Sequence, residues 1–296
     1  MTEQSRLIAE TTPAPQDWLD WIGRSETARD IITVERAAAL AATLDVPPPA
    51  AGDALPPGWH WIFFNSFVPR SEVGTDGHPK RGGFLPPVPL PRRMWAGGRI
   101  DCLAPLILGQ TATKTSEITK IENKSGRRGN LVFVTVRHII SMGTGPCIVE
   151  EQDIVYRDPP LPGAAPPQPE PAPVAPAHVI ELSPDPVLLF RYSALTFNGH
   201  RIHYDRSYAQ AEEGYRDLVV HGPLLATLLQ GLASAARPDA RLRRFAFRGL
   251  APVFVDAPFR IEASPGAGPD DLLLWIRDSG GGQAMAANAV YDRDTP

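Results

Sequence analysis

An apolar run without a single charged residue, PLLATLLQGLASAA at 223–236, is the clearest pattern in the chain. Proline at its start suits the first turn of a helix, and a helix that is apolar on every side must be buried. Shorter runs rich in β-forming residues follow near 244–247, 259–263, 272–278 and 284–291. This order predicts an α+β domain in which antiparallel strands wrap around one central helix.

The first half of the chain has a weaker pattern of the same kind. It predicts a helix near 34–44, strands near 59–65, 99–107, 131–140 and 146–156, and a Pro/Gly-rich insertion at 68–91. LAPLILGQ at 103–110 is similar to LAPVFVDA at 250–257, the β-rich run 131–140 parallels 272–277, and the ending at 155–158 parallels 290–294. Matches in the same order indicate a duplicated domain.

Length and composition fit two domains joined by a linker. The chain has 296 residues, and its segment 159–186 is too rich in Pro and Ala to form a helix or a central strand. We therefore predict domains at 1–158 and 187–296 with an extended linker between them. No run approaches the roughly 20 apolar residues that span a bilayer, and the N-terminus lacks the features of a secretory signal, so we expect a cytoplasmic protein without membrane contact.

Charge and cysteine content narrow the functional classes. A net charge of -4 argues against general nucleic-acid binding, although the arginines at 241–248 form a local basic cluster that could meet an anionic ligand. Only two cysteines, Cys102 and Cys147, are present, and their spacing is unlike a metal site. We expect both to be reduced, buried apolar residues.

Reactive side chains concentrate in two neighbouring windows, LFRYSALTFNGHRIHYDRSYA at 189–209 and LVVHGPLLATLLQ at 218–230. Three of the seven histidines, His200, His203 and His221, lie there, but the nearby carboxylates lack the usual helical spacing of metal ligands, so no metal site is predicted. Asp205 is expected to cap a short helix at 206–211. Together the two windows predict one catalytic pocket.

The segment SALTFNGHRIHYD at 193–205 resembles the signature of the type 2 3-hydroxyacyl-thioester dehydratases, a branch of the MaoC-like hotdog hydratases. The resemblance to this group extends over residues 187–291. Where most of that group has Asp-x-Asn-Pro-Leu/Ile-His, this chain has Asn198, His200, Arg201, Ile202 and His203 at the Asp, Asn, Pro, aliphatic and His positions. The branch includes two-domain mesaconyl-CoA and itaconyl-CoA hydratases with a degenerate first half. The resemblance thus implies a double hotdog that hydrates such an acyl-CoA or dehydrates a 3-hydroxyacyl thioester, with CoA only as part of the substrate and no cofactor.

Three residues carry the predicted chemistry. His203 titrates near neutral pH, so it can take a proton from water and return it to Cα. Asn198 cannot transfer protons in this way, and we expect its amide to orient the water or the 3-hydroxyl. The alternative is that the Asn198 side chain only stabilises the turn. The N-H of Gly222, at the start of the apolar helix, would accept the negative charge of the thioester oxygen, unless Gly222 serves only to begin that helix.

Six further residues are predicted to touch the substrate. Arg191 and Arg201 flank the signature and would bind a carboxylate or the phosphates of CoA, although most arginines are merely solvated. The remaining four, expected to line the pocket or the acyl channel, are His200, Tyr215, His221 and Pro223.

Two other functions stay open at this point. A hotdog thioesterase often uses a carboxylate on the central helix, and 223–236 contains no Asp or Glu. A nonenzymatic thioester-binding subunit would have no need of His203. The region 31–44, which matches the histidine window, contains no histidine, so one active site per chain is expected. Whether CoA or an acyl carrier protein bears the substrate, and whether the chain forms a homodimer, is left open.

Overall fold

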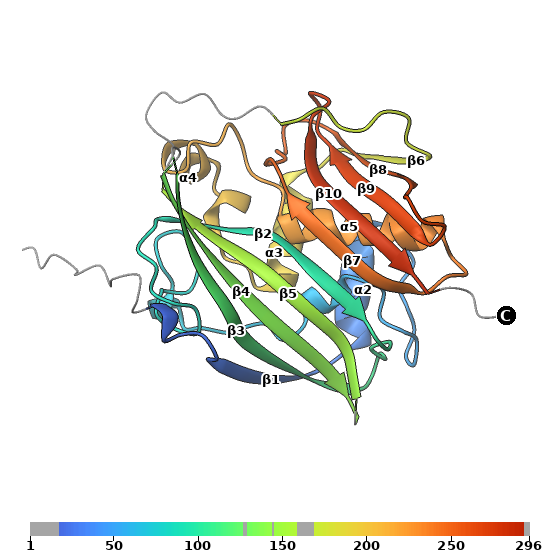
Figure 1. Cartoon of the computed structure of the whole chain (residues 1–296), viewed down its shortest axis with the longest axis horizontal. Helices are drawn as coiled ribbons and strands as arrows, with labels where there is room; N and C mark the ends of the chain where they lie inside the picture. Colours follow the sequence, from blue (N-terminus) through green and yellow to red (C-terminus); the bar gives the residue numbers. More distant parts are fainter. Residues whose placement is uncertain (1–17, 127–128, 144, 159–168, 293–296) are drawn as a thin grey trace, which may run out of the picture.

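A computed structural model describes residues 18–126, 129–143, 145–158 and 169–292, and its named strands form one ten-stranded antiparallel sheet (Figure 1). In spatial order the strands are β1 (Ser25–Ile31), β3 (Thr111–Gly126), β4 (Gly129–Met142), β5 (Gly145–Arg157), β2 (Arg92–Cys102), β7 (Leu242–Gly249), β10 (Gln283–Tyr291), β9 (Asp271–Arg277), β8 (Phe259–Pro265) and β6 (His178–Leu182).

The sheet consists of two half-sheets with the same internal order. β3-β4-β5-β2 in the first half corresponds to β8-β9-β10-β7 in the second, and the halves join where β2 pairs with β7, from Gly97 opposite Arg248 to Asp101 opposite Arg244. The two similar LAP segments follow β2 and β7, and the tyrosines that end the repeat, Tyr156 and Tyr291, are both buried. The predicted duplication is therefore confirmed.

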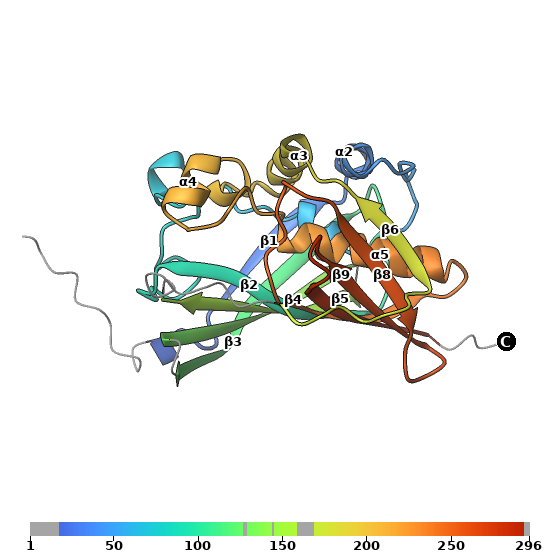
Figure 2. The ribbon, with the colours of Figure 1, turned by 90° about the horizontal axis from the view of Figure 1, so that it is seen from above.

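The central helix of the second half forms where the sequence predicts it. α5 (Gly222–Ala236) begins after His221, has Pro223 in its first turn and packs against β7, β8, β9 and β10. Figure 2 shows the helix lying across one face of the curved sheet. The Tyr291 hydroxyl donates a hydrogen bond to the Ala233 carbonyl at 2.8 Å, which ties β10 to the helix. The four strands predicted for this half are likewise confirmed.

In the first half a short 3-10 helix, η1 (Trp59–Ile62), occupies the place of that central helix. The isolated bridges Ala54–Ile107 and Val219–Phe254 precede η1 and α5 in the same way, which makes the two segments counterparts. The strand predicted at 59–65 is wrong. The aromatic residues of this segment favour a strand locally, but Gly58 turns the chain with a φ of 81°. The side chains of Trp59 and Ile62 are then buried in the core.

Two helices pack side by side on the outer side of the central elements. α2 (Val34–Leu44), capped by the Thr33 side chain, confirms the predicted helix at 34–44. The sequence did not predict α3 (Pro186–Thr196), which starts at an Asp185 cap with proline in its first turn and packs against α2. The matched position of these helices in the two halves extends the internal repeat (Figure 2).

Edge strands and strand ends were the hardest elements to predict. β1 and β3 were not predicted, and the strand expected at 99–107 ends at Cys102. β6 lies inside the segment expected to be an extended linker, where it forms an outer strand paired with β8. Residues 159–168 of that segment lie outside the described part of the chain.

Other global expectations concern membranes and thiols. No helix within the described residues is both long and apolar enough to cross a bilayer. Both cysteines are free; Cys147 is buried as expected, whereas Cys102 is partly exposed. Burial raises the pKa of the Cys102 thiol to about 11, which leaves it protonated and unreactive at neutral pH.

Candidate active site

His203 is held with one ring nitrogen ready to accept a proton. It ends η3 (Arg201–His203), a short 3-10 turn between α3 and α4 (Arg206–Ala211), and it is buried. Its Nδ1 lies 2.7 Å from the Val219 carbonyl oxygen, so Nδ1 carries the hydrogen and Nε2 keeps a free lone pair. Burial lowers the pKa of His203 to about 4. At neutral pH the ring is uncharged, which is the form that a general base requires.

His221 supports this ring from the other side. The His203 and His221 rings stack with centroids 3.6 Å apart and planes inclined by 18°. His221 Nε2 lies 2.8 Å from the Ser193 hydroxyl of α3. Burial, followed by the proximity of His203 and His200, lowers the pKa of His221 well below its usual value. Two neutral rings therefore lie in contact, and the orientation of His203 is fixed by this stacking and by the hydrogen bond at Nδ1.

Asn198 stands where α3 ends. Phe197 adopts a left-handed conformation with a φ of 50°, and the Asn198 side-chain oxygen then accepts a hydrogen bond from the His200 backbone N-H at 3.0 Å. This contact confirms that Asn198 stabilises the turn. Because its oxygen is used in this way, the amide NH₂ is the group left to meet a ligand.

Gly222 is the first residue of α5, where backbone N-H groups have no partner within the helix. No described group accepts a hydrogen bond from its N-H. A Cβ built on Gly222 would meet no atom within 4 Å, so there is open space beside this backbone. The helix N-terminus and the exposed N-H together suit an anionic oxygen.

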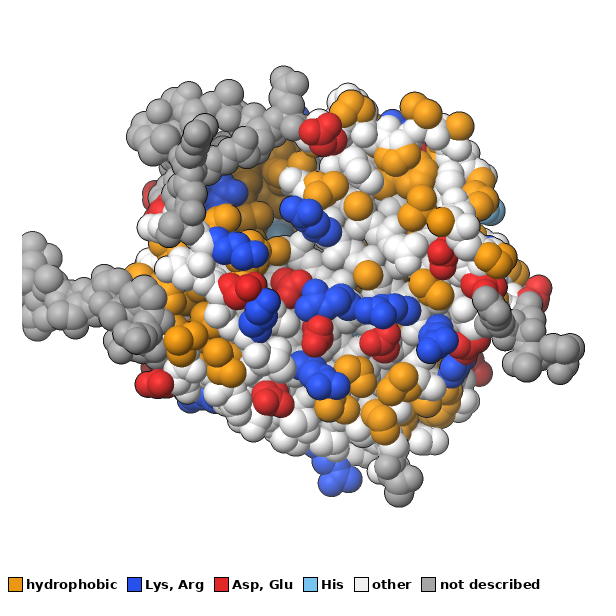
Figure 3. Space-filling model, in the orientation of Figure 1, with side chains coloured by type: hydrophobic (Ala, Val, Ile, Leu, Met, Phe, Trp, Pro, Cys, Tyr) orange, Lys and Arg blue, Asp and Glu red, His pale blue; other side chains and the backbone are white. Residues whose placement is uncertain are grey.

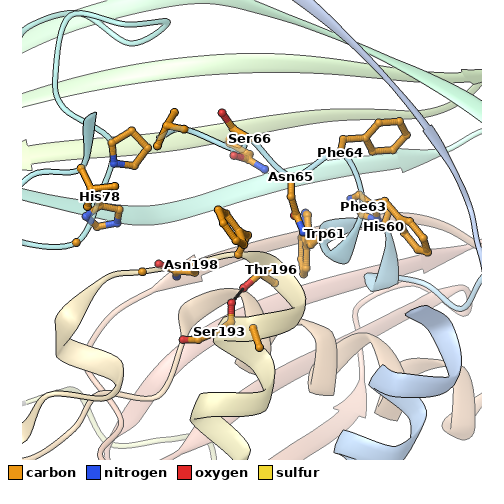
Figure 4. A pocket seen from close by; sticks show the side chains of 18 of the residues that line it. His60, Trp61, Phe63, Phe64, Asn65, Ser66, His78, Ser193, Thr196 and Asn198 are labelled. Atoms are coloured by element: carbon orange, nitrogen blue, oxygen red, sulfur yellow. Dashed lines mark hydrogen bonds between the residues drawn. The ribbon is translucent and has the colours of Figure 1, made fainter. Parts of the chain in front are cut away.

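A cavity of about 790 Å³ lies between α3 and the first half-sheet. It exists because η1 and the following loop cover only part of the concave face that α5 fills in the second half. Figure 4 shows Asn198 and Ser193 along one wall and aromatic residues of η1 and its loop along another. His203, His221 and Gly222 are not among the residues that line it. Exposed aromatic side chains stand along its opening: Phe190, Phe197 and Tyr204.

The far end of the cavity is polar. Glu150 is buried and accepts hydrogen bonds from His60 at 3.1 Å, Trp61 at 2.9 Å and Gln152 at 2.9 Å. Burial would raise the pKa of Glu150, but the hydrogen bond and charge of His60 outweigh burial and lower the pKa to about 2. Lys114 of β3 also lines this end, with its ammonium 5.5 Å from the Phe64 ring centroid. No described carboxylate lies within 4 Å of that ammonium.

The Pro/Gly-rich insertion reaches the signature, which the sequence did not foresee. The Arg201 backbone N-H donates to the Asp76 carbonyl at 2.9 Å, and the Arg201 guanidinium donates to the Thr75 carbonyl at 3.1 Å. His78 thereby comes to lie beside His200, with ring centroids 4.1 Å apart. The only sequence signal was the adjacent Asp-Gly-His triplet at 76–78, inside a segment with no repeat counterpart.

Asp76, His78 and His200 are also the nearest approach to a metal-ligand set within the described residues. Their ligand atoms lie within 4.8 Å of one another. Ligand atoms around one zinc ion stand about 3.4 Å apart, given bonds of roughly 2.1 Å. His78 Nδ1 is moreover already 3.1 Å from Asp76 Oδ2. The arrangement suits a carboxylate–imidazole hydrogen bond better than a shared ion.

The other predicted substrate-binding residues lie around this centre. Arg191 is exposed on α3 and donates to the Ala42 carbonyl at 3.3 Å. Arg201 forms an ion pair with Asp205 at 2.7 Å, in addition to its contacts with the insertion. Tyr215 packs against Phe254, and Pro223 lies in the first turn of α5. None of these four lines the cavity, so their predicted contact with substrate is still untested.

Asp205 has the structural role predicted for it. Its side chain accepts a hydrogen bond from the Tyr208 backbone N-H at 3.0 Å and caps α4 at Arg206–Ala211. The arginine cluster at 241–248 lies on an outer face of the sheet, where Arg241 pairs with Asp292 and Arg244 with Asp101. Figure 3 shows basic and acidic side chains interspersed on this face, with a hollow beside the end of β7.

Two antiparallel half-sheets are fused edge to edge, and a buried, neutral histidine follows five residues after an asparagine, near the start of the central helix in sequence. These features define a class: double-hotdog enzymes that act on acyl thioesters. The family model for hydroxyacyl-thioester dehydratase type 2 matches residues 58–255, a span that includes the insertion as well as the signature. The chain belongs to this family, and it is a hydro-lyase that acts on acyl thioesters.

Individual relatives agree with this assignment. The chain is 53% identical over 275 residues to the mesaconyl-C(4)-CoA hydratase of Chloroflexus aurantiacus, covering 92% of this chain and 96% of that protein. Among solved structures, HtdX of Mycobacterium tuberculosis has a TM-score of 0.62 at 18% identity, covering 90% and 99% of the two chains. A conserved hypothetical protein of the same organism, described as a double hotdog, has a TM-score of 0.53 at 14% identity, covering 92% and 96%. The likeness to these structures confirms the double-hotdog fold.

Proposed function

We propose that this enzyme hydrates a mesaconyl-type CoA thioester, adding water across a double bond that is conjugated to the thioester carbonyl. The observation that carries the proposal is the orientation of His203, whose Nδ1 hydrogen bond to the Val219 carbonyl leaves Nε2 free to accept a proton. The activity of the Chloroflexus aurantiacus relative, at 53% identity, supports this substrate class.

In this mechanism His203 Nε2 takes a proton from water while the water oxygen bonds to Cβ. The electron pair of the double bond moves through Cα to the thioester oxygen, and the Gly222 N-H at the N-terminus of α5 stabilises the resulting charge. Asn198 orients the attacking water through its amide NH₂. The imidazolium of His203 can then return the proton to Cα, so the reaction needs no cofactor beyond the CoA of the substrate.

A free carboxylate on the acyl group fits beside Lys114 at the polar end of the cavity, where the Glu150 carboxylate is already bound by His60, Trp61 and Gln152. Lys114 supplies a positive charge there that no described carboxylate neutralises at ion-pair distance. Burial lowers the pKa of Lys114, and a bound carboxylate would favour its charged form. We therefore assign the acyl group to this cavity, whose polar end is built by the first half of the chain and whose other wall is α3 of the second half.

Hydrolysis of the thioester is the less favoured alternative. α5 contains no Asp or Glu that could serve as the nucleophile or base of a hotdog thioesterase. The neutral His203 and the free Gly222 N-H suit addition of water at Cβ, where no acyl-enzyme has to be resolved.

The test is the absorbance of the conjugated enoyl thioester with purified protein and mesaconyl-C(4)-, itaconyl- and crotonyl-CoA. We expect the absorbance to fall with at least the mesaconyl substrate. The rate of this fall should be about 100-fold or more lower in His203→Gln. Free thiol, followed in parallel, should not appear. Release of CoA without hydration would establish a thioesterase, and turnover unchanged in His203→Gln would refute the mechanism.

A further inference from the structure

The insertion that links η1 to β2 places a second histidine in the site. Asp76 and Thr75 are tied to the signature by the Arg201 backbone N-H and guanidinium, at 2.9 Å and 3.1 Å. The position of the Asp76–His78 turn is therefore set by the same residue that begins η3, which ends at His203.

Asp76 orients the His78 ring. Asp76 Oδ2 lies 3.1 Å from His78 Nδ1, and Asp76 Oδ1 accepts a hydrogen bond from the His78 backbone N-H at 3.0 Å. The carboxylate fixes the hydrogen on Nδ1 and stabilises the imidazolium form, leaving Nε2 to exchange a proton. His78 is thus a carboxylate-backed acid–base group.

His78 faces the cavity, whereas His203 lies behind its wall. Figure 4 shows His78 and Asn198 at the same end of the cavity, carried by the insertion and by the end of α3. The ring of His200 lies next to both histidines, 4.1 Å from His78 and 5.5 Å from His203 between ring centroids. The two candidate proton carriers therefore belong to one cluster of three imidazole rings, and of these three rings His78 is the one that lines the cavity.

Addition of water requires two proton transfers, one from water and one to Cα. Asn198 occupies the position of a carboxylate in related signatures, and an amide cannot carry either proton. We propose that His78, backed by Asp76, is the second proton-transfer residue of the site and delivers the proton to Cα. This inference rests on the proposed hydration. It changes one step of that mechanism, because the proton on Cα now comes from His78 and not from His203.

The steps balance without any further reactant. Water bonds to Cβ and loses one proton to His203 Nε2, while the electron pair of the double bond moves to the enolate. The protonated Nε2 of His78 then gives its proton to Cα, and the enolate collapses to the thioester. The enzyme is left with a proton on His203 and none on His78 Nε2. Transfer of one proton from His203 to His78 through solvent restores the starting state.

This mechanism makes a specific demand on pH. The active form carries one proton on the pair His78 and His203, so kcat/KM should fall both at low pH, where both are protonated, and at high pH, where neither is. A single-histidine mechanism would show only the acid limb. The charged and titratable groups that act on His78 are Asp76, His200, His203, Arg81 and Arg93. Burial lowers the pKa of His78 and Asp76 opposes that effect, so the alkaline limb should begin near or below neutrality.

The experiment compares the wild-type enzyme with His78→Gln, Asp76→Asn and Lys80→Ala. Lys80 lies in the same insertion with an exposed side chain, and the contact that holds it is its backbone N-H bond to the Glu72 carbonyl. We expect kcat for hydration to fall 100-fold or more in His78→Gln and about 10-fold in Asp76→Asn, with KM within about threefold. Lys80→Ala should match the wild type. His78→Gln should also lose the alkaline limb of the pH profile.

Several outcomes would overturn this role. Turnover within threefold of wild type in His78→Gln, or an alkaline limb that persists in it, would show that His78 moves no proton. Loss of turnover on removal of metal with EDTA, restored by Zn²⁺, would show that Asp76, His78 and His200 bind an ion instead. If the wild type itself hydrates none of the three thioesters, the proposed function fails first. If His78→Gln does not fold, as judged by circular dichroism, Asp76→Asn decides through the same pH profile.

Discussion

Gly77 and Gly199 lie backbone against backbone, at the point where the insertion of the first half meets the signature of the second. A Cβ built on Gly77 would lie 1.8 Å from the Gly199 carbonyl oxygen, and a Cβ on Gly199 would lie 2.7 Å from the Gly77 carbonyl oxygen. Only two glycines allow this approach. The candidate active site is therefore composite, because its geometry depends on a contact between segments far apart in the sequence.

Gly77→Ala should disrupt the site more than it disrupts the fold. The new methyl group meets backbone, so the turn that carries His78 must shift, and a displacement of about 1 Å near reacting groups can cost 100-fold in rate. We expect kcat to fall roughly 10- to 100-fold. Gly82→Ala is the matched control, since its φ of +87° resembles the +89° of Gly77 but its Cβ would meet nothing closer than 3.7 Å. Equal losses of activity in the two variants would show that backbone strain, not the contact, is responsible.

Gly222→Pro tests the oxyanion role of the backbone N-H. Proline is tolerated at the first position of a helix, and His221, with φ -60° and ψ 130°, already has a conformation compatible with a following proline. The variant should fold but lose about 100- to 1000-fold in kcat, because it lacks the donor. Gly222→Ala keeps the N-H and places its methyl group in open space, so we expect less than a tenfold loss. Steady-state hydration kinetics check both; similar rates in the two variants would exclude this role.

The stability of the protein should fall as the pH drops from 6.5 towards 4. Burial lowers the pKa of His203 from 6.5 to about 4, so in this range the unfolded state binds a proton that the folded state does not. The contribution of the neutral His203 to stability is fully present above pH 6.5. Between pH 6.5 and 5 this one group should lower the free energy of unfolding by about 1.5 kcal/mol.

Urea unfolding of wild type and His203→Gln at pH 5, 6, 7 and 8 measures this effect. Glutamine does not titrate, so the pH dependence should be shallower in the variant by roughly the amount stated above. Burial, the largest cause of the lowered pKa values of His200 and His221, acts in both proteins, and the variant removes the smaller effect of a nearby His203 on them. Parallel stability curves would mean that His203 is protonated alike in the folded and unfolded states.

Lys114→Met should separate dicarboxylic from monocarboxylic substrates. If Lys114 binds the free carboxylate of a mesaconyl thioester, its loss should raise KM about 10-fold or more for that substrate and leave crotonyl-CoA within about twofold. Lys120→Met on the same strand is the control, because Lys120 is exposed and pairs with Glu122 at 2.9 Å. An equal rise of KM for both thioesters would place the carboxylate elsewhere.

Elements whose signals are local could be predicted from the amino-acid sequence. The uncharged run that became α5, the four strands of the second half and the helix α2 follow from hydrophobic pattern, caps and proline placement, which act over a few residues. The close spacing of Asn198 and His203 likewise made the signature visible without a structure. The repeat of LAP and Tyr segments showed the duplication, because equivalent strands need equivalent buried positions.

The spatial role of several segments depends on contacts that form only in the folded chain. The aromatic run at 59–65 has the local preference of a strand, but packing of Trp59 and Ile62 into the core makes it the short helix η1 and leaves a cavity beside it. His78 joins His200 through long-range backbone contacts, and Lys114 and Glu150 meet the cavity from separate strands. Such contacts depend on the pairing of distant segments, which local periodicity does not encode.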